Sequence, residues 1–272
     1  MPNCKTIAIC NQKGGTGKTT TTVNLGVGLA RLGKKVLLVD ADPQGDLTTC
    51  LGWRDNDSLT TTITDKLSGV IREDHTDPRS GILHHEENVD LLPANIELSA
   101  MEMMLVTAMS RETILRSYLS KVKDNYDYVL IDCMPSLGMV TLNALAAADS
   151  VIIPVQAQYL PAKGMTKLLQ TVGKVQRKIN SNLKITGIVM TLADLNTNLT
   201  KSTIETIRES FGKNIRVFDT IIPKATKASE ASISGKSIYM YAKDYKVALA
   251  YENLTKELIN NQKVKHKEEF NR

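Results

Sequence analysis

The sequence predicts an α/β fold, with a doubly wound, mostly parallel sheet and helices on both of its faces. Short apolar runs alternate with amphipathic stretches of helical period along most of the 272 residues, as expected for strand–helix–strand units. The apolar runs are nearly continuous, which indicates parallel strands that are buried on both faces. No linker divides the pattern, so we expect one domain over residues 1–260 and a charged, flexible tail over 261–272.

The expected elements follow from these runs in chain order. Six apolar runs predict strands at Thr6–Cys10, Val36–Asp40, Tyr128–Asp132, Val151–Val155, Ile185–Met190 and Val217–Ile222. Three stretches with an apolar stripe at helical spacing predict helices at Arg111–Lys123, Thr166–Lys178 and Lys201–Phe211. A last helix is expected to pack on the core through Val247, Tyr251, Leu254 and Leu258.

The stretch Arg54–Asp90 fits this alternation least well, and it holds 9 acidic and 4 basic residues. Its segment "REDHTDPRSG" is typical of an exposed loop. The neighbouring pair His84–His85 has no partners at metal-ligand spacing, so we expect a solvated surface pair and not a metal site.

Composition restricts the class of protein. The 42% hydrophobic and 23% charged content is ordinary for a globular protein. No apolar run approaches the ~18 residues of a membrane span, and the first residues do not form a signal peptide. The four cysteines form no C-x-x-C pair and are expected to be buried free thiols in a reducing cytoplasm: Cys4, Cys10, Cys50 and Cys133.

The net charge of +5 is unevenly distributed along the chain. Residues 160–272 hold 20 Lys and Arg against 10 Asp and Glu, whereas residues 1–159 hold 14 against 19. A basic second half beside an acidic first half indicates a polyanionic partner for one face, although solubility alone also accounts for surface lysines.

The segment "NQKGGTGKTTTTVNLG" at residues 11–26 has the features of a phosphate-binding loop between a strand and a helix. Its glycines let the backbone approach phosphate oxygens, and the following helix adds its positive dipole end. Lys18 is expected to contact the β- and γ-phosphates, and the Thr19 hydroxyl is the natural Mg²⁺ ligand. The expected contacts to the nucleotide are therefore Lys13, Gly14, Gly15, Thr16, Gly17, Lys18, Thr19 and Thr20.

Three carboxylates lie at or just beyond the ends of predicted strands, at the edge where ligands bind in parallel sheets. "VLLVDADPQGD" ends one strand with Asp40 and has Asp42 two residues further on, and "YDYVLIDCMPSLG" ends another strand with Asp132. A carboxylate near Mg²⁺ can hold the waters of the metal, and one near the γ-phosphate can orient the attacking water. These residues predict a Mg²⁺-dependent ATPase.

The order of five segments resembles that of the ParA/Soj-type partition ATPases, which belong to the deviant Walker A group of P-loop proteins. The likeness covers nearly all of Lys5–Ile259 and is weakest across Arg54–Asp90. The segments are "KGGTGKTT", "VLLVDADPQGDLT", "YDYVLIDCMPSLG", "VIIPVQAQY" and "IIPKATKASEASISGKSI".

The resemblance implies roles for single residues. Two subunits of the family enclose two ATP molecules, and the signature lysine, here Lys13, reaches the nucleotide of the partner, whereas Lys18 serves its own. By the same resemblance Asp42 positions the hydrolytic water and Pro223 lies at the adenine. Thr19 binds Mg²⁺, and Asp40 and Asp132 support the metal shell.

The resemblance also implies two partners. One is the double-stranded DNA of the nucleoid, bound without sequence preference, and the other is a ParB-type protein that stimulates slow ATP hydrolysis. Lys201, Lys224, Lys227 and Lys236 are the expected DNA contacts. The chain departs from the family at Asn196, where relatives usually have a DNA-binding arginine, and at Cys133-Met134-Pro135, where they commonly have two prolines.

Two alternatives remain open from the sequence. A MinD-like ATPase attaches to membranes through a C-terminal amphipathic helix, but residues 261–272 hold little bulky apolar surface, so we expect no membrane partner. The second alternative is an ATP-switched dimer whose target is a protein and not DNA.

Overall fold

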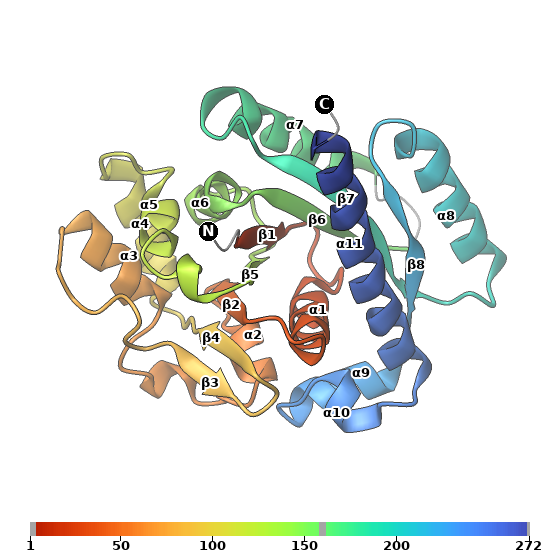
Figure 1. Cartoon of the computed structure of the whole chain (residues 1–272), viewed down its shortest axis with the longest axis horizontal. Helices are drawn as coiled ribbons and strands as arrows, with labels where there is room; N and C mark the ends of the chain where they lie inside the picture. The colour runs from red at the N-terminus through yellow and green to blue at the C-terminus, as the bar shows by residue number, and fades with distance from the viewer. Residues whose placement is uncertain (1–3, 158–161, 271–272) are drawn as a thin grey trace.

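One eight-stranded sheet runs through the computed structural model, which describes residues 4–157 and 162–270 (Figure 1). The side chains of residues 162, 163 and 261–270 lie outside the description. The strands are β1 (Lys5–Ile9), β2 (Val36–Ala41), β3 (Leu83–His85), β4 (Val89–Leu92), β5 (Tyr128–Cys133), β6 (Ser150–Gln156), β7 (Lys184–Ala193) and β8 (Val217–Pro223). Their order is β3-β4-β2-β5-β1-β6-β7-β8, and only the described pair β3–β4 is antiparallel. The predicted doubly wound, mostly parallel sheet is confirmed.

Helices cover both faces of this sheet. The first face is covered by α1 (Lys18–Arg31), α2 (Asp46–Cys50), α9 (Thr226–Ile233), α10 (Ile238–Ala242) and α11 (Lys246–Phe270). The second face is covered by α3 (Ile63–Ile71), α4 (Leu98–Thr107), α5 (Ile114–Leu119), α6 (Met139–Ala147), α7 (Ala162–Lys178) and α8 (Asn198–Phe211). Two short 3₁₀ turns, Asn56–Ser58 and Lys123–Asn125, complete the described elements.

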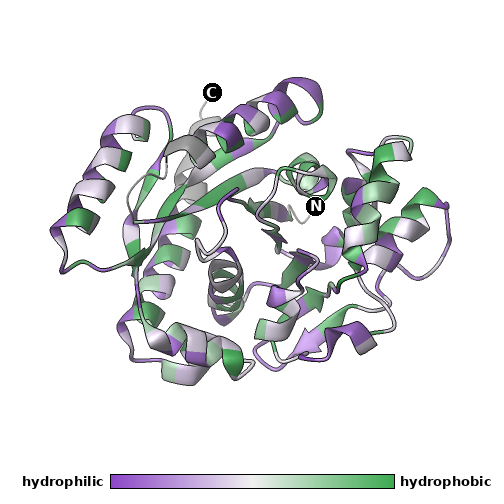
Figure 2. Cartoon of the chain, turned by 180° about the vertical axis from the view of Figure 1, so that it is seen from behind, coloured by the Kyte–Doolittle hydropathy of each residue, from purple (hydrophilic) through white to green (hydrophobic). Residues whose placement is uncertain are grey.

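Strand side chains alternate between the two layers, although nearly all of them are apolar. Ile7 and Ile9 of β1 enter the layer of α1 and α11, whereas Ala8 of β1 and Cys10 just after it enter the layer of α4–α8. The inner strands are mostly green in Figure 2, and the helices carry purple segments between their apolar ones. Continuous apolar runs therefore reflect burial on both faces, as the sequence predicted.

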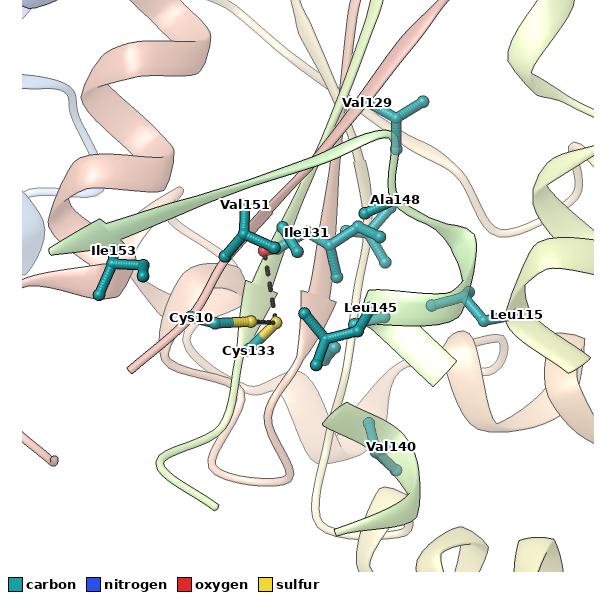
Figure 3. Packing of buried hydrophobic residues seen from close by; sticks show 14 of the residues in the cluster. Cys10, Leu115, Val129, Ile131, Cys133, Val140, Leu145, Ala148, Val151 and Ile153 are labelled. Carbon is teal, nitrogen blue, oxygen red and sulfur yellow. Dashed lines mark hydrogen bonds between the residues drawn. The ribbon is translucent and has the colours of Figure 1, made fainter. Parts of the chain in front are cut away.

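The candidate site lies at the ends of the sheet strands, where β1 and β5 pair in parallel and two thiols lie beside each other. Cys10 ends the run of β1 and Cys133 ends β5, and their sulfurs lie 2.7 Å apart within an apolar cluster that includes Val151 and Leu145 (Figure 3). Both cysteines are free and buried, as predicted. Cys4 and Cys50 are also free, but the prediction of burial is wrong for them, because they are partly exposed.

The predicted elements are found with small changes of boundary. All six expected strands exist, and β7 extends to Ala193, three residues further than predicted. The helix expected at Arg111–Lys123 is shorter than predicted: only α5 is helical, and the residues on either side of it form turns. The last helix packs on the core through the four predicted apolar residues, which are buried. The division of the chain at residue 260 stays a prediction.

The acidic stretch is more ordered than its composition indicated. It contains α3, β3 and the start of β4, and only residues 72–81 form the expected exposed loop. His84 is exposed, but His85 is buried: its Nε2 lies 3.2 Å from the Gly235 carbonyl oxygen and its ring contacts Trp53. The prediction of a solvated histidine pair is therefore wrong for His85, because the Gly235 turn covers it.

None of the helices in the described part of the chain combines the length and the apolar content that crossing a bilayer demands.

Candidate nucleotide-binding site

The loop between β1 and α1 has the backbone of a phosphate cradle. Gly15 and Gly17 have φ angles of 69° and 78°, which non-glycine residues rarely adopt. A Cβ atom added to Gly14 or Gly15 would meet nothing within 4 Å, so the space above the loop is open. Gly17 directly precedes α1, whose first N–H groups and positive dipole end face the same loop. This arrangement fits the phosphates of a nucleotide.

Neighbouring strands hold the loop in place. The buried Asn11 side chain donates from Nδ2 to the Pro154 carbonyl oxygen on β6 at 2.6 Å, and its Oδ1 accepts from the Lys13 backbone N–H at 3.0 Å. The Thr191 hydroxyl on β7 donates to the Thr16 carbonyl oxygen at 2.7 Å. The loop is therefore preorganised before any ligand binds.

The two lysines of the loop differ in their surroundings. Lys18 is buried, with 7% of its surface exposed, and its charge partly opposes the rise in pKa that burial causes at Asp132 and Asp42. Lys13 is exposed, and its ammonium group forms no hydrogen bond or ion pair with any described residue. One lysine thus belongs to the interior of the site, and the other faces outward.

Asp132 and the first turn of α1 form one hydrogen-bonded unit. The Thr19 hydroxyl donates to Asp132 Oδ2 at 2.6 Å, and the Thr22 hydroxyl lies 3.3 Å from Asp132 Oδ1. Asp40 lies directly opposite Asp132 in the β2–β5 register. Its Oδ2 accepts from the Thr48 backbone N–H at 2.9 Å and from the Thr48 hydroxyl at 2.7 Å. The structure brings the predicted metal residues to one edge of the sheet.

Burial raises the pKa values of these carboxyls. Burial raises the pKa of Asp40 to about 7, against the opposing effect of the Thr48 hydrogen bonds. Burial and the nearby charge of Asp40 raise the pKa of Asp132 to about 8, against the Thr19 hydrogen bond. The pKa of Asp42 is also raised by burial. A divalent cation at this edge would favour the ionised carboxylates.

We expect the nucleotide-free protein to lose stability as the pH rises from about 4 to about 8. The folded pKa values of Asp40 and Asp132 lie above the unfolded value of 3.8, so the folded state binds more protons in this range. The free energy of unfolding should fall by up to about 1.4 kcal/mol per pH unit for each carboxyl. Urea unfolding at several pH values, without Mg²⁺, measures this change.

Asp40→Asn is the matched variant for that measurement, because it keeps the shape of the side chain and removes one titrating group. The slope of stability against pH should become shallower in this variant. A free energy of unfolding that rises with pH over the same range would contradict the assignment of raised pKa values.

Mg²⁺ fits the site as a partner of phosphate. Within the described ranges, no group of three or more His, Cys, Asp or Glu side chains could hold a metal ion by itself. The Thr19 hydroxyl would hold the ion together with phosphate oxygens and water, and Asp132 and Asp40 would hold its waters. When bound, Mg²⁺ supplies positive charge that offsets the negative charge on the phosphates.

A pocket of about 320 Å³ adjoins the phosphate loop on the side of β8 and α9. Gly17, Thr20 and Pro223 line it together with the apolar side chains of Ile222, Ala228 and Val247. A mostly apolar pocket beside a phosphate cradle suits a flat nucleobase. The predicted adenine residue Pro223 lies where such a base would fit.

Asp42 lies just beyond β2 and is half-buried. Its Oδ1 accepts from the Gln44 backbone N–H at 3.0 Å. Its Oδ2 has no hydrogen-bond partner among the described residues, so this oxygen is available to a water molecule. That arrangement suits a residue that orients water.

The four lysines predicted to contact DNA differ in availability. Lys224 is exposed and lines a groove of about 1090 Å³ together with Asn196. Lys227 is paired with Glu230 at 2.7 Å and lies over the Tyr241 ring. Lys201 is exposed on α8, and Lys236 is half-buried between α9 and α10. Lys224 and Lys201 are therefore the most accessible of the four, and Lys227 already has an acidic partner.

Sequence reasoning missed three residues that hold the site. Asn11 and Thr22 flank the phosphate loop, and the run of four threonines from Thr19 was the available signal for Thr22. Thr48 was missed because nothing in the segment after Asp42 indicates that the chain turns back to Asp40. Its hydroxyl also accepts from the Ala94 backbone N–H at 3.0 Å, which joins α2 to the end of β4.

Comparisons with known proteins agree with this geometry. A family described as an AAA domain matches residues 4–185. The chain is 45% identical to the sporulation initiation inhibitor protein Soj of Bacillus subtilis, with 94% of this chain and 99% of Soj aligned. It is 43% identical to the chromosome-partitioning ATPase Soj of Treponema pallidum, over 94% and 97% of the two chains. Cobyrinic acid a,c-diamide synthase of Mycobacterium smegmatis, solved with an ATP analogue and magnesium, matches with a TM-score of 0.83 at 35% identity over 96% of each chain.

Proposed function

The chain belongs to the AAA-domain family of ATPases that includes the Soj proteins, and on that premise we propose that it is a DNA-partition ATPase. It is a Mg²⁺-dependent ATPase. The proposal adds that ATP drives formation of a homodimer, that this dimer binds DNA without sequence preference, and that hydrolysis resets it. The two Soj proteins share more sequence identity with this chain than the structurally similar synthase does, which favours partition over a biosynthetic reaction.

The different surroundings of Lys13 and Lys18 carry the proposal. A single triphosphate needs one buried lysine, and Lys18 is placed for it. Lys13 sits in the same loop with its ammonium group exposed and without a partner among the described residues. A second subunit facing this edge would bring its own triphosphate to Lys13, and the attraction would exist only while ATP is bound.

The remaining site residues have definite roles in this proposal. Lys18 and the glycines of the loop hold the phosphates, and Pro223 contacts the adenine. Thr19 binds Mg²⁺, with Asp40 and Asp132 behind it. Asp42 orients the attacking water through the oxygen that has no described partner. The described part of the chain shows no arginine directed at the phosphates, so slow hydrolysis and a stimulating partner of the ParB type are part of the proposal.

DNA binding is proposed for the basic second half of the chain. Lysine contacts to phosphate groups do not distinguish base sequences, and they weaken with salt. A dimer presents the contacts of two subunits to one DNA molecule, although each subunit keeps the same surface. ATP can therefore control DNA affinity through dimerisation. The proposed location is the cytoplasm, over the nucleoid.

We expect the protein to bind DNA selectively in ATP. The logarithm of its association constant for DNA should fall with the logarithm of the salt concentration, at a slope near −5. This value corresponds to about three phosphate contacts per subunit at −0.9 each. Lys224→Ala should weaken binding equally for all DNA sequences and reduce the slope by about 2 in the dimer. Fluorescence anisotropy with two unrelated duplexes, in ATP and in ADP, measures both quantities across a salt series.

Two lysine variants serve as controls in this experiment. Lys227→Ala should have a smaller effect, because Glu230 already neutralises that ammonium group. Lys121→Ala removes an exposed charge from the acidic half and should change nothing. If the ATP dimer forms but ignores DNA, the replacement of the family arginine by Asn196 is decisive and the target is a protein. If the protein instead sediments with liposomes in ATP, the MinD-like alternative holds.

A further inference from the structure

Glu102 joins α4 to the helix that follows the Asp132 strand. Its carboxylate accepts hydrogen bonds from the backbone N–H groups of Met139 at 2.5 Å and of Val140 at 2.9 Å. These residues form the first turn of α6, whose preceding residue is Gly138 and offers no side chain to cap the helix. A carboxylate from a different helix thus satisfies the exposed donors at the start of α6.

Gly138 makes room for this contact. A Cβ atom placed on Gly138 would lie 1.8 Å from Glu102 Oε1, so any larger residue would displace the carboxylate. The backbone of Gly138 is extended, with φ −78°, and does not itself require glycine. The absence of a side chain at Gly138 therefore permits the close approach of the carboxylate.

Glu102 is itself held firmly by α4. Leu98, Met101 and Leu105 on the same helix are fully buried against α3 and α6. The packed helix therefore fixes the backbone position from which the Glu102 carboxylate reaches α6. Two charge-assisted hydrogen bonds from backbone donors make this a strong connection.

The contact fixes one end of a five-residue loop, residues 134–138, whose other end follows Asp132 and Cys133. Within the loop, the Ser136 hydroxyl accepts from the Gly138 N–H at 3.3 Å, and the Ser136 carbonyl oxygen accepts from the Thr141 hydroxyl at 2.9 Å. The loop therefore spans from the Thr19–Asp132 hydrogen bond to the Glu102 anchor. If Asp132 and Thr19 have the roles proposed above, this loop lies beside the phosphates of bound ATP.

We propose that Glu102 is a positioning residue for ATP hydrolysis, acting through the N-terminus of α6 on the loop after Asp132. Glu102 does not touch the nucleotide. It keeps the loop at the distance from the γ-phosphate that hydrolysis requires, and this inference rests on the proposed assignment of the site. Misplacement of a positioned group by about 1 Å can cost up to about 100-fold in rate.

The test compares kcat and KM for ATP in three variants of the full chain. Glu102→Ala should lower kcat by about 10- to 100-fold and leave KM for ATP within about twofold. Glu102→Gln keeps one acceptor oxygen and should retain an intermediate kcat. Gly138→Ala should reproduce the loss by displacing the carboxylate, and its combination with Glu102→Ala should be no slower than Glu102→Ala alone.

Asp65→Ala is the matched structural control. Asp65 also caps a helix with its carboxylate, accepting from the Thr62 N–H at 2.8 Å at the start of α3, but it has no contact with the loop after Asp132. Both variants should lower Tm by a similar amount, and only Glu102→Ala should lower kcat. The proposal is overturned if kcat falls equally in both variants, if KM rises in parallel, or if the losses from Gly138→Ala and Glu102→Ala add.

These outcomes are separable from failure of the proposed function. ATP hydrolysis and its dependence on Glu102 are measured without DNA and without a partner protein. A wild-type chain that hydrolyses ATP but ignores DNA leaves the Glu102 inference standing. If Glu102→Ala hydrolyses ATP as fast as the wild type, the inference about Glu102 is refuted and the proposed partition function still stands.

Discussion

Replacing Asp42 with alanine should lower kcat for ATP hydrolysis by about 10²- to 10³-fold and leave ATP binding intact. The Asp42 Oδ2 atom has no described partner, while its Oδ1 is held by the Gln44 N–H. That pairing keeps the carboxylate oriented and one oxygen ready for water. Its removal takes away the group that aligns water with the γ-phosphate, but no contact to the phosphates or the base.

A second result should follow from the same variant. With hydrolysis blocked, the ATP-bound dimer should persist, so Asp42→Ala should stay dimeric in ATP where the wild type returns to monomer. Phosphate release and size-exclusion chromatography with light scattering measure the two effects. Asp46→Ala is the matched control, because Asp46 is a neighbouring but exposed carboxylate on α2. Equal hydrolysis by Asp42→Ala and Asp46→Ala would remove Asp42 from the mechanism.

The parts of the site that the sequence predicted are those fixed by local chemistry. Gly15 and Gly17 are needed where they stand because their φ angles are positive, whatever the rest of the chain does. Asp40 and Asp132 follow continuous apolar runs, and the ends of neighbouring parallel strands must meet at one edge. Short-range rules of this kind determine both the cradle and the positions of the carboxylates.

The parts that escaped prediction depend on contacts between distant segments. Glu102 caps α6 from α4, 37 residues away in sequence, and no pattern within either helix reveals the partner. Thr48 reaches back to Asp40 and also holds Ala94. The strands β3 and β4 are short and join the sheet edge within an acidic stretch, so their periodicity is too weak to detect. Tertiary packing decides such features, and composition does not.

Lys13→Ala should abolish ATP-dependent dimerisation at concentrations where the wild type dimerises fully. Removal of one partner from a buried charge pair costs about 2–5 kcal/mol. The dimer dissociation constant should therefore rise by about 30-fold to several thousand-fold. ATP binding by the monomer should change little, because Lys18 supplies the charge for the nucleotide of its own chain. Light scattering and fluorescent-ATP titration separate the two effects.

Lys18→Ala gives the opposite pattern and makes the comparison decisive. It removes the buried charge beside Asp132, so ATP affinity itself should fall, and the dimer should be lost only as a consequence. Saturating ATP should then restore some dimer in Lys18→Ala and none in Lys13→Ala, since only the latter lacks the charge directed at the partner. If Lys13→Ala dimerises normally, the outward lysine has another ligand, and control of DNA binding by ATP must arise from a change of shape within one subunit.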